Sequence, residues 1–243
     1  MASDSVRDLL TRRGAMGLLA VGTGLLVSGC ALISGESTYR FRMTVEVQTP
    51  QSLKSGSSVM EIVAYKDPFV IGDYSGGHSG VGGQAVVIDL PGGPVFALLT
   101  IGDGAPLLAS QVTYALAPEA RSGDFDAYLA AVRKLGRASE GAIEAELPHH
   151  LSYSYGGDDH PEADLAWPMM VRFRNLNDPM SVERVDPAAI GVKRIILTVT
   201  KEPLTVGIDK RLGWLEKLEN FRYDGKTPFN ELYPREATYL RTR

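Results

Sequence analysis

Hydrophobic and polar residues alternate most clearly at positions 39–47. One face of this segment carries Tyr39, Phe41, Met43, Val45 and Val47. A period of two predicts a strand with one buried and one solvated face. Residues 58–65 repeat the alternation more weakly. The apolar runs 85–90 and 95–101, joined by Pro91-Gly92-Gly93-Pro94, predict a hairpin that is buried on both faces.

Helical spacing is clearest in residues 124–135. The apolar face of this segment carries Phe125, Tyr128, Leu129, Val132 and Leu135. Ser122 or Asp124 can cap its start, and Gly136 follows its last predicted turn. A short second helix is predicted around 214–218, and the remaining apolar runs predict strands at 111–116, 168–174, 181–185 and 192–200. The pattern as a whole predicts a mostly β or α+β protein, with an antiparallel sheet or sandwich and one or two packed helices.

A basic flank and a short apolar run open the chain. Arg7, Arg12 and Arg13 precede the uncharged stretch 14–27. A helix that spans a membrane needs roughly 20 apolar residues, so this stretch is typical of an export signal instead. Thr11-Arg12-Arg13 also resembles the twin-arginine motif, which implies export in a folded state. The general secretory route stays open as the alternative.

The end of this apolar run resembles a known processing site. Val27-Ser28-Gly29-Cys30 is similar to the lipobox of bacterial lipoproteins, although leucine is the usual first residue. The resemblance implies cleavage between Gly29 and Cys30, and acyl chains such as palmitate on Cys30. Two or more chains anchor a protein stably to a membrane, whereas a single chain does not. A buried structural cysteine is the alternative interpretation.

This resemblance divides the chain into a signal peptide at 1–29, a lipidated tether at 30–37 and a single β-rich periplasmic domain at 38–243. Ala31 stands where inner-membrane lipoproteins of the enteric type carry aspartate, so the outer membrane is favoured. The composition narrows the classes of site, because a single cysteine among 243 residues excludes intramolecular disulfides and multi-cysteine metal clusters. A net charge of −4 shows no excess of Lys and Arg of the kind that indicates nucleic-acid binding.

A glycine-rich tract at 72–83 invites a catalytic interpretation. Gly80, Gly82 and Ala85 match the spacing of a dinucleotide-binding loop, but such a loop must open a helix, and here a strand is predicted to follow. His78-Ser79 suggests a hydrolase elbow, which requires glycine where Val81 stands. The tract is therefore predicted to be a loop between two strands.

A second candidate site lies at 148–164. This segment holds three of the four histidines together with several carboxylates, a combination that suits zinc, manganese or iron(II). The residues chosen as ligands of a divalent metal are His150, Asp158 and His160, with Glu162 as a base. Adjacent histidines point to opposite sides of an extended segment, and no H-E-x-x-H helix is present. A solvated polar loop is therefore the preferred interpretation of this segment.

A looser resemblance covers about a quarter of the chain. Residues 171–187, 192–200 and 206–215 are similar to a set of uncharacterised bacterial proteins of unknown function, which implies no chemistry. The sequence therefore favours a membrane-anchored envelope lipoprotein that acts as a binding or assembly component, with the lipid on Cys30 holding it to the membrane. An envelope protein is its expected partner. The alternative is a metal-dependent hydrolase that uses the loop 149–164.

Overall fold

A computed structural model describes residues 36–66, 76–102, 104, 107–121, 124–150, 153–155, 158–160, 166–221 and 228–242, with backbone alone at 153–155 and 158–160. Residues 34–243 form one compact unit. The signal segment and Cys30 lie outside the described residues. No helix in the described ranges is long and apolar enough to cross a membrane.

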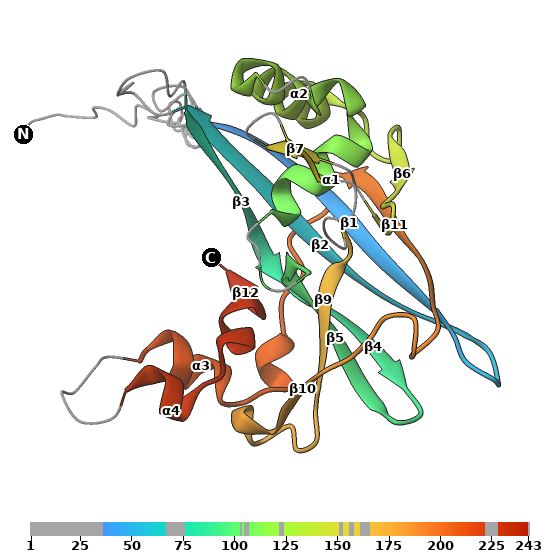
Figure 1. Cartoon of the computed structure of the whole chain (residues 1–243), viewed down its shortest axis with the longest axis vertical. Helices are drawn as coiled ribbons and strands as arrows, with labels where there is room; N and C mark the ends of the chain where they lie inside the picture. Colours follow the sequence, from blue (N-terminus) through green and yellow to red (C-terminus); the bar gives the residue numbers. More distant parts are fainter. Residues whose placement is uncertain are drawn as a thin grey trace, which may run out of the picture. The chain divides into compact units, whose positions relative to one another are not determined.

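The larger sheet is antiparallel, with six strands in the order β12-β3-β2-β1-β11-β6 (Figure 1). Its strands are β1 (Ser37–Gln48), β2 (Leu53–Lys66), β3 (Gly77–Gln84), β6 (Glu144–Glu146), β11 (Val192–Thr200) and β12 (Arg241–Thr242). In the centre, Phe41 of β1 pairs with Met60 on one side and Val199 on the other. The alternation predicted at 39–47 is confirmed, because the apolar face of β1 is buried along its whole length.

The smaller sheet has the order β10-β9-β5-β4, and all its pairs are antiparallel. Its strands are β4 (Val86–Leu90), β5 (Gly93–Ile101), β9 (Pro168–Phe173) and β10 (Val182–Arg184). The predicted hairpin at 85–101 is confirmed as β4 and β5. The predicted burial on both faces holds for β5 from Val95 to Ile101 but is wrong for β4, where Val87 is half-buried and Asp89 is exposed. This sheet meets the larger one closely at Gly56, where a Cβ atom would lie 2.0 Å from the carbonyl oxygen of Val87. A separate two-stranded hairpin joins β7 (Tyr153–Tyr155) to β8 (Asp158–His160).

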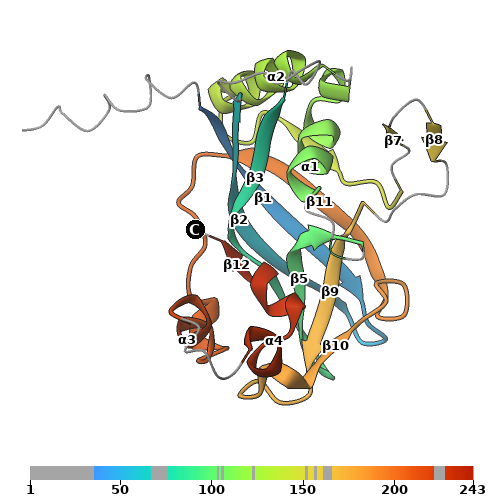
Figure 2. The ribbon, with the colours of Figure 1, turned by 60° about the vertical axis from the view of Figure 1, so that its left-hand side comes forward.

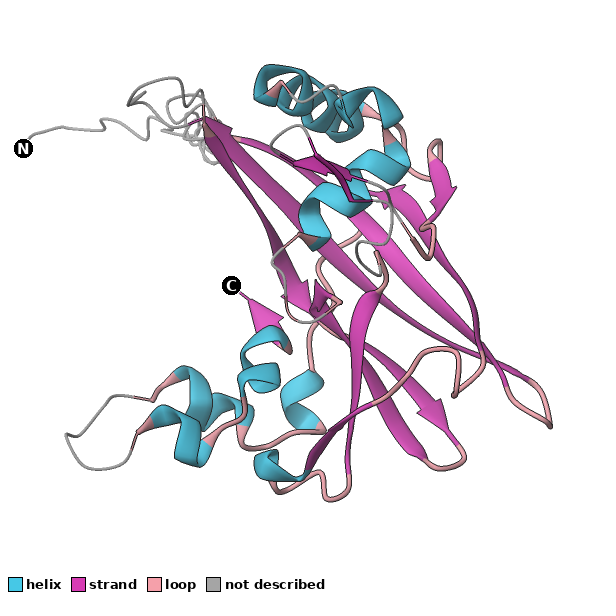
Figure 3. Ribbon diagram, viewed as in Figure 1, coloured by secondary structure: helices cyan, strands magenta, loops and turns pink. Residues whose placement is uncertain are grey.

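Helices cover both sheets (Figures 2 and 3). The described helices are α1 (Leu108–Leu116), α2 (Phe125–Arg137), α3 (Leu215–Glu219) and α4 (Phe229–Leu232), with 3₁₀ turns η1 (Pro118–Arg121), η2 (Pro179–Ser181), η3 (Ile208–Lys210) and η4 (Arg235–Tyr239). The backbone N–H of Asp126 donates to Asp124, which caps α2 as predicted. The helix continues past Gly136 to Arg137. Two antiparallel sheets with packed helices confirm the α+β, sandwich-like fold class.

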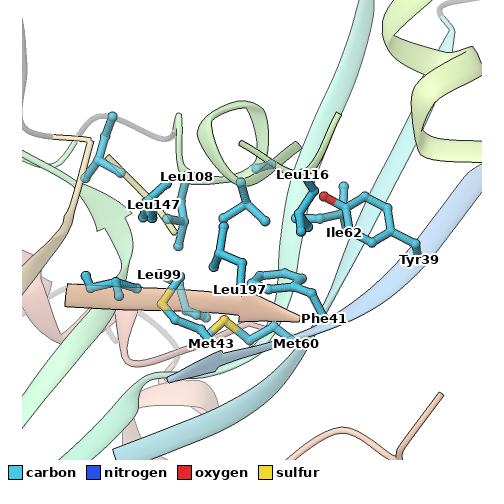
Figure 4. Packing of buried hydrophobic residues seen from close by; sticks show 14 of the residues in the cluster. Tyr39, Phe41, Met43, Met60, Ile62, Leu99, Leu108, Leu116, Leu147 and Leu197 are labelled. Atoms are coloured by element: carbon cyan, nitrogen blue, oxygen red, sulfur yellow. The ribbon is translucent and has the colours of Figure 1, made fainter. Parts of the chain in front are cut away.

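Two clusters of apolar side chains form the core. The first lies between the larger sheet, β5 and the helices α1 and α2, and Figure 4 shows Phe41, Met60 and Leu197 at its centre. The second packs the other face of the smaller sheet against the C-terminal segment 208–240, around Phe96 and Trp214. The fold therefore has two covering layers, one made of α1 and α2 and the other of the C-terminal helices.

Two predictions of local structure are wrong. Residues 111–116 form most of helix α1 and not a strand, because Leu108, Val112 and Leu116 fall on one helical face and are buried there. Residues 77–84 form strand β3 and not a loop, because the main chain pairs with β2 from Glu61 to Lys66. The phenyl ring of Phe125 occupies the space where a side chain at Gly77 would lie.

Candidate functional site

The residues of the predicted lipidation site lie just ahead of the described structure. Gly29 and Cys30 fall outside it, and strand β1 begins at Ser37. Across the sheet, Ser37 pairs with Ala64 of β2, and Ala64 pairs with Ser79 of β3. With neighbouring strands ~4.8 Å apart, Ser79 lies about 10 Å from the first residue of β1. Ser79 therefore lies at the same end of the sheet as the start of β1.

The proposed metal ligands are only partly within the described residues. His150 is exposed, Asp158 and His160 lie on β8 opposite Tyr155 and Tyr153, and Glu162 lies outside. Within the described part of the chain, no group of three or more His, Cys, Asp or Glu residues is placed to hold a metal ion. The metal site stays a prediction, which metal analysis of the purified chain can test.

His149, next to the proposed ligand, has a packing role. Its ring meets Trp167 edge-on with the centroids 4.4 Å apart, and the Trp167 indole N–H donates to the carbonyl of Leu147 over 2.8 Å. Desolvation by burial lowers the pKa of His149, the nearby His150 lowers it further, and Asp186 raises it. The His149 ring therefore packs against an indole whose N–H is already bonded to the main chain.

The glycine-rich strand separates His78 from Ser79. The ring of His78 lies 5.5 Å from that of Tyr65, on the face of the sheet away from the helices. Ser79 points to the opposite face, because side chains alternate along a strand, and it lines a pocket below α1 and α2. The two side chains therefore do not form a nucleophile and base pair, which agrees with the rejection of a hydrolase elbow.

The pocket beside Ser79, called the hydroxyl pocket below, is lined by several polar side chains. It has a volume of about 120 Å³, and β3, α1, η1 and α2 supply its walls. The lining residues are Ser79, Ser110, Tyr114, Ala120, Asp124, Phe125 and Tyr128. Cofactor and drug sites are typically ~300–1,000 Å³, so this pocket suits a small group and not a whole cofactor.

A chain of hydroxyl groups leads from the pocket into the core. Thr113 donates to the Ala109 carbonyl over 2.8 Å, and its oxygen lies 2.9 Å from the Tyr39 hydroxyl and 3.1 Å from that of Tyr128. Thr113 has one proton and directs it to Ala109, so both tyrosines donate to Thr113. Burial raises the pKa of Tyr39 and of Tyr128, which keeps both phenols protonated at neutral pH.

This arrangement decides what the pocket offers to a ligand. The Tyr128 proton is directed inward, so the phenol oxygen can accept a hydrogen bond in the pocket, which Ser79 and Ser110 also line. The hydroxyl groups of both serines and the Asp124 carboxylate line the same pocket, and each can accept a hydrogen bond. These groups accept hydrogen bonds, and a ligand group that donates them is the chemical complement.

Aromatic rings and one cation complete the site. Phe125 stacks on Tyr128 with the centroids 5.5 Å apart, and Tyr114 meets Tyr128 edge-on at 6.0 Å. The Arg121 guanidinium lies 5.9 Å from the centre of the Tyr114 ring, outside the lining of the pocket. Arg121 and Asp124 therefore place opposite charges beside the same pocket.

A larger, open groove of about 440 Å³ lies at the far end of β1. Three turns border it, at 48–51, 90–93 and 188–191, together with Val95 and Arg172. The charged residue of this lining, Arg172, is paired with Glu183 at 3.0 Å. The groove is mostly apolar, and the chemistry of its lining residues points to no particular ligand.

The hydroxyl pocket was not predicted from the sequence. Ser110 and Tyr114 belong to a helix, where a spacing of four brings them to one face, but residues 111–116 were predicted to be a strand and Ser110 was assigned to no element. Ser79 belongs to the tract that was predicted to be a loop. Asp124 was identified, although only as a helix cap.

Comparisons with family models, with curated proteins and with solved structures gave no match to this chain.

Proposed function

We propose that this chain is a lipid-anchored lipoprotein of the bacterial cell envelope, which faces the periplasm and acts as a binding or assembly component. The observation that carries the proposal is the position of the only cysteine, Cys30, directly behind a basic flank, a short apolar run and two small residues. The outer membrane is the favoured location, because Ala31 follows the cysteine.

The distance between Cys30 and the folded unit supports this proposal. Strand β1 begins at Ser37, seven positions after Cys30. A fully extended chain spans at most ~3.6 Å per residue, so the start of β1 stays within about 25 Å of the anchor. In this proposal the row Ser37, Ala64 and Ser79 is the end of the sheet that the tether joins to the anchor.

The length of β1 places the open groove at the opposite end. The strand runs to Gln48, which borders the groove, and a strand rises ~3.4 Å per residue, or about 35 Å over this length. The lipid would confine the domain to the membrane surface and raise its effective concentration for partners there. In this arrangement the hydroxyl pocket lies near the lipid and the groove lies toward the periplasm.

Replacement of Cys30 by alanine tests the anchoring. The wild-type chain is expected to fractionate with membranes and to incorporate labelled palmitate, and Cys30→Ala is expected to lose both properties. Ser28→Ala is the matched control, because it keeps a small residue before the cleavage site and should still be processed. Lipid labelling that persists in Cys30→Ala would refute the proposal.

A further inference from the structure

The hydroxyl pocket combines three features that define a ligand. Ser79 and Ser110 line it with hydroxyl groups that can accept hydrogen bonds, Asp124 lines it with a carboxylate, and Arg121 lies beside it with a guanidinium. The volume of about 120 Å³ equals roughly four water molecules at ~30 Å³ each, which is enough for a small charged group and its first carbons.

The carboxylate is the group that selects a cation. One oxygen of Asp124 accepts from the Asp126 backbone N–H over 2.9 Å, and within the described residues Asp124 makes no ion pair. The neighbouring acids are already paired, Asp126 with Lys66 at 2.8 Å and Glu119 with Lys134 at 2.6 Å. Asp124 is therefore the carboxylate at this pocket that can receive a ligand cation.

The acceptors on the inner wall select the type of cation. A primary ammonium has three N–H donors, which can be directed to Ser79, Ser110 and Asp124. A trimethylated ammonium has no N–H donor, so it would leave these acceptors without partners. It would gain the charge attraction to Asp124 and none of these hydrogen bonds, so the pocket favours a primary ammonium over a trimethylated one.

Arg121, which lies outside the pocket lining, indicates which group the other end of the ligand carries. Arg121 is exposed, contacts the Tyr114 ring, and makes no ion pair with another described residue. A guanidinium is well suited to a phosphate, which it can bind through two parallel hydrogen bonds. A ligand in which a short linker joins an ammonium to a phosphate can place the ammonium in the pocket and the phosphate at Arg121.

We propose that this pocket binds a zwitterionic lipid headgroup in which a short linker joins a phosphate to a primary ammonium, as in phosphatidylethanolamine. The ammonium lies among Ser79, Ser110 and Asp124, and the phosphate lies at Arg121. The choice of a lipid as the source rests on the proposed anchoring, which keeps the Ser37 to Ser79 row at the membrane end of the domain. The headgroup would then orient the domain at the surface where the acyl chains hold it.

The soluble headgroup tests the pocket independently of the anchor. The purified full chain is titrated by calorimetry with glycerophosphoethanolamine and with glycerophosphocholine. Saturable binding of the first compound, at least tenfold tighter than that of the second, supports the assignment. Absence of saturable binding, or equal binding of both compounds, overturns it.

Variants locate the binding to this pocket. Asp124→Asn keeps the helix cap, since asparagine caps as well as aspartate, and should weaken binding at least fivefold. Arg121→Gln should weaken glycerophosphoethanolamine binding and leave ethanolamine binding unchanged. The matched control is Asp178→Asn, which alters another capping aspartate, that of η2, and should have no effect. Unchanged binding in Asp124→Asn overturns the proposal.

A vesicle assay identifies the source of the ligand. The Cys30→Ala chain, which lacks the proposed lipid, should float with vesicles of phosphatidylethanolamine and phosphatidylcholine, and not with vesicles of phosphatidylcholine alone. If an acetylated lysine amide binds as tightly as glycerophosphoethanolamine, the ligand is an amine on a peptide and the lipid assignment is overturned. Failure of the Cys30 labelling test alone leaves the calorimetric result standing, so the two proposals can fail separately.

Discussion

The two covering layers of this fold bury their sheets by different means. The layer of α1 and α2 contains hydroxyl groups that bond in a fixed order through Thr113. The C-terminal layer is built from rings, with Phe173 edge-on to Phe96 at 5.6 Å and to Trp214 at 5.5 Å. The Trp214 indole N–H donates to the Leu176 carbonyl over 2.9 Å, so the polar atom in that stack is also satisfied.

The difference explains why the layer of α1 and α2 contains the hydroxyl pocket. A stack of rings is held by shape and dispersion, and its polar atoms are directed to the backbone. A chain of hydroxyls has direction, because each proton has one acceptor, and the free lone pairs accumulate at its outer end. In this protein that end is the pocket beside Ser79 and Asp124.

Removal of a ring from the C-terminal layer should have the largest effect on stability. Phe96 is fully buried, and Phe96→Ala leaves a cavity between the smaller sheet and Trp214. The expected loss in free energy of unfolding is about 3–5 kcal/mol, measured by urea denaturation. Phe41→Ala in the other cluster is the comparison and should cost a similar amount. A loss below about 1 kcal/mol at Phe96 would contradict the description of this layer as packed rings.

The hub of the hydroxyl chain should give the next largest effect. Thr113→Val keeps the shape of the side chain, but the buried hydroxyls of Tyr39 and Tyr128 lose their acceptor. We expect a loss of about 1–3 kcal/mol in free energy of unfolding. Thr113→Ser retains the hydroxyl and is the matched control. Equal stability of the two variants would show that the hydroxyl chain does not hold this layer together.

The elements predicted correctly from sequence are those with a repeating side-chain pattern. Strand β1 has an uninterrupted period of two, and α2 combines a helical apolar face with the cap at Asp124. The segment 91–94 contains glycine and proline between two apolar runs, which was sufficient to predict the β4–β5 turn. In each case the information is local.

The elements predicted wrongly depend on distant contacts. Strand β3 consists largely of glycine, so its pairing is determined by the main chain of β2 and by Phe125, which covers Gly77. Helix α1 buries the polar residue Thr113, because Tyr39, far away in sequence, provides a partner. The pocket combines residues of four elements, and no single segment of the sequence carries its pattern.

One glycine in each layer shows how closely the cover approaches the sheet. A Cβ atom at Gly136 in α2 would lie 2.5 Å from the carbonyl oxygen of Thr38, whereas at Gly213, before α3, no atom lies within 4 Å. Alanine normally stabilises a helix by about 1 kcal/mol relative to glycine. We expect the opposite sign for Gly136→Ala, a net loss of about 1–2 kcal/mol from overpacking. Gly213→Ala is the control and should change stability by less than about 0.5 kcal/mol. Thermal denaturation of both variants checks the sign, and a stabilised Gly136→Ala would contradict the close approach of α2 to β1.

The smallest effect is expected at the ion pair that joins the C-terminal layer to β4. Arg211 donates to both oxygens of Asp89, at 2.6 and 2.8 Å, and this hydrogen bonding lowers the pKa of the carboxyl group. The Asp89 side chain is 66% exposed, so solvent screens the pair and the expected coupling is below about 1 kcal/mol.

The pH dependence of this coupling has a definite sign. Because the pKa of Asp89 is lowered in the folded state, its contribution to stability is fully present above the pKa of the unfolded chain, about 3.9, and is lost as the pH falls through the folded value. A double-mutant cycle with Asp89→Asn and Arg211→Gln, measured by urea denaturation, should show coupling at neutral pH and none below the folded pKa. The coupling should also fall in about 1 M salt, where the Debye length is ~3 Å. Coupling that persists in both acid and salt would mean that a shielded charge pair holds the C-terminal layer as well as its rings. Ring packing alone would then not distinguish this layer from the layer of α1 and α2.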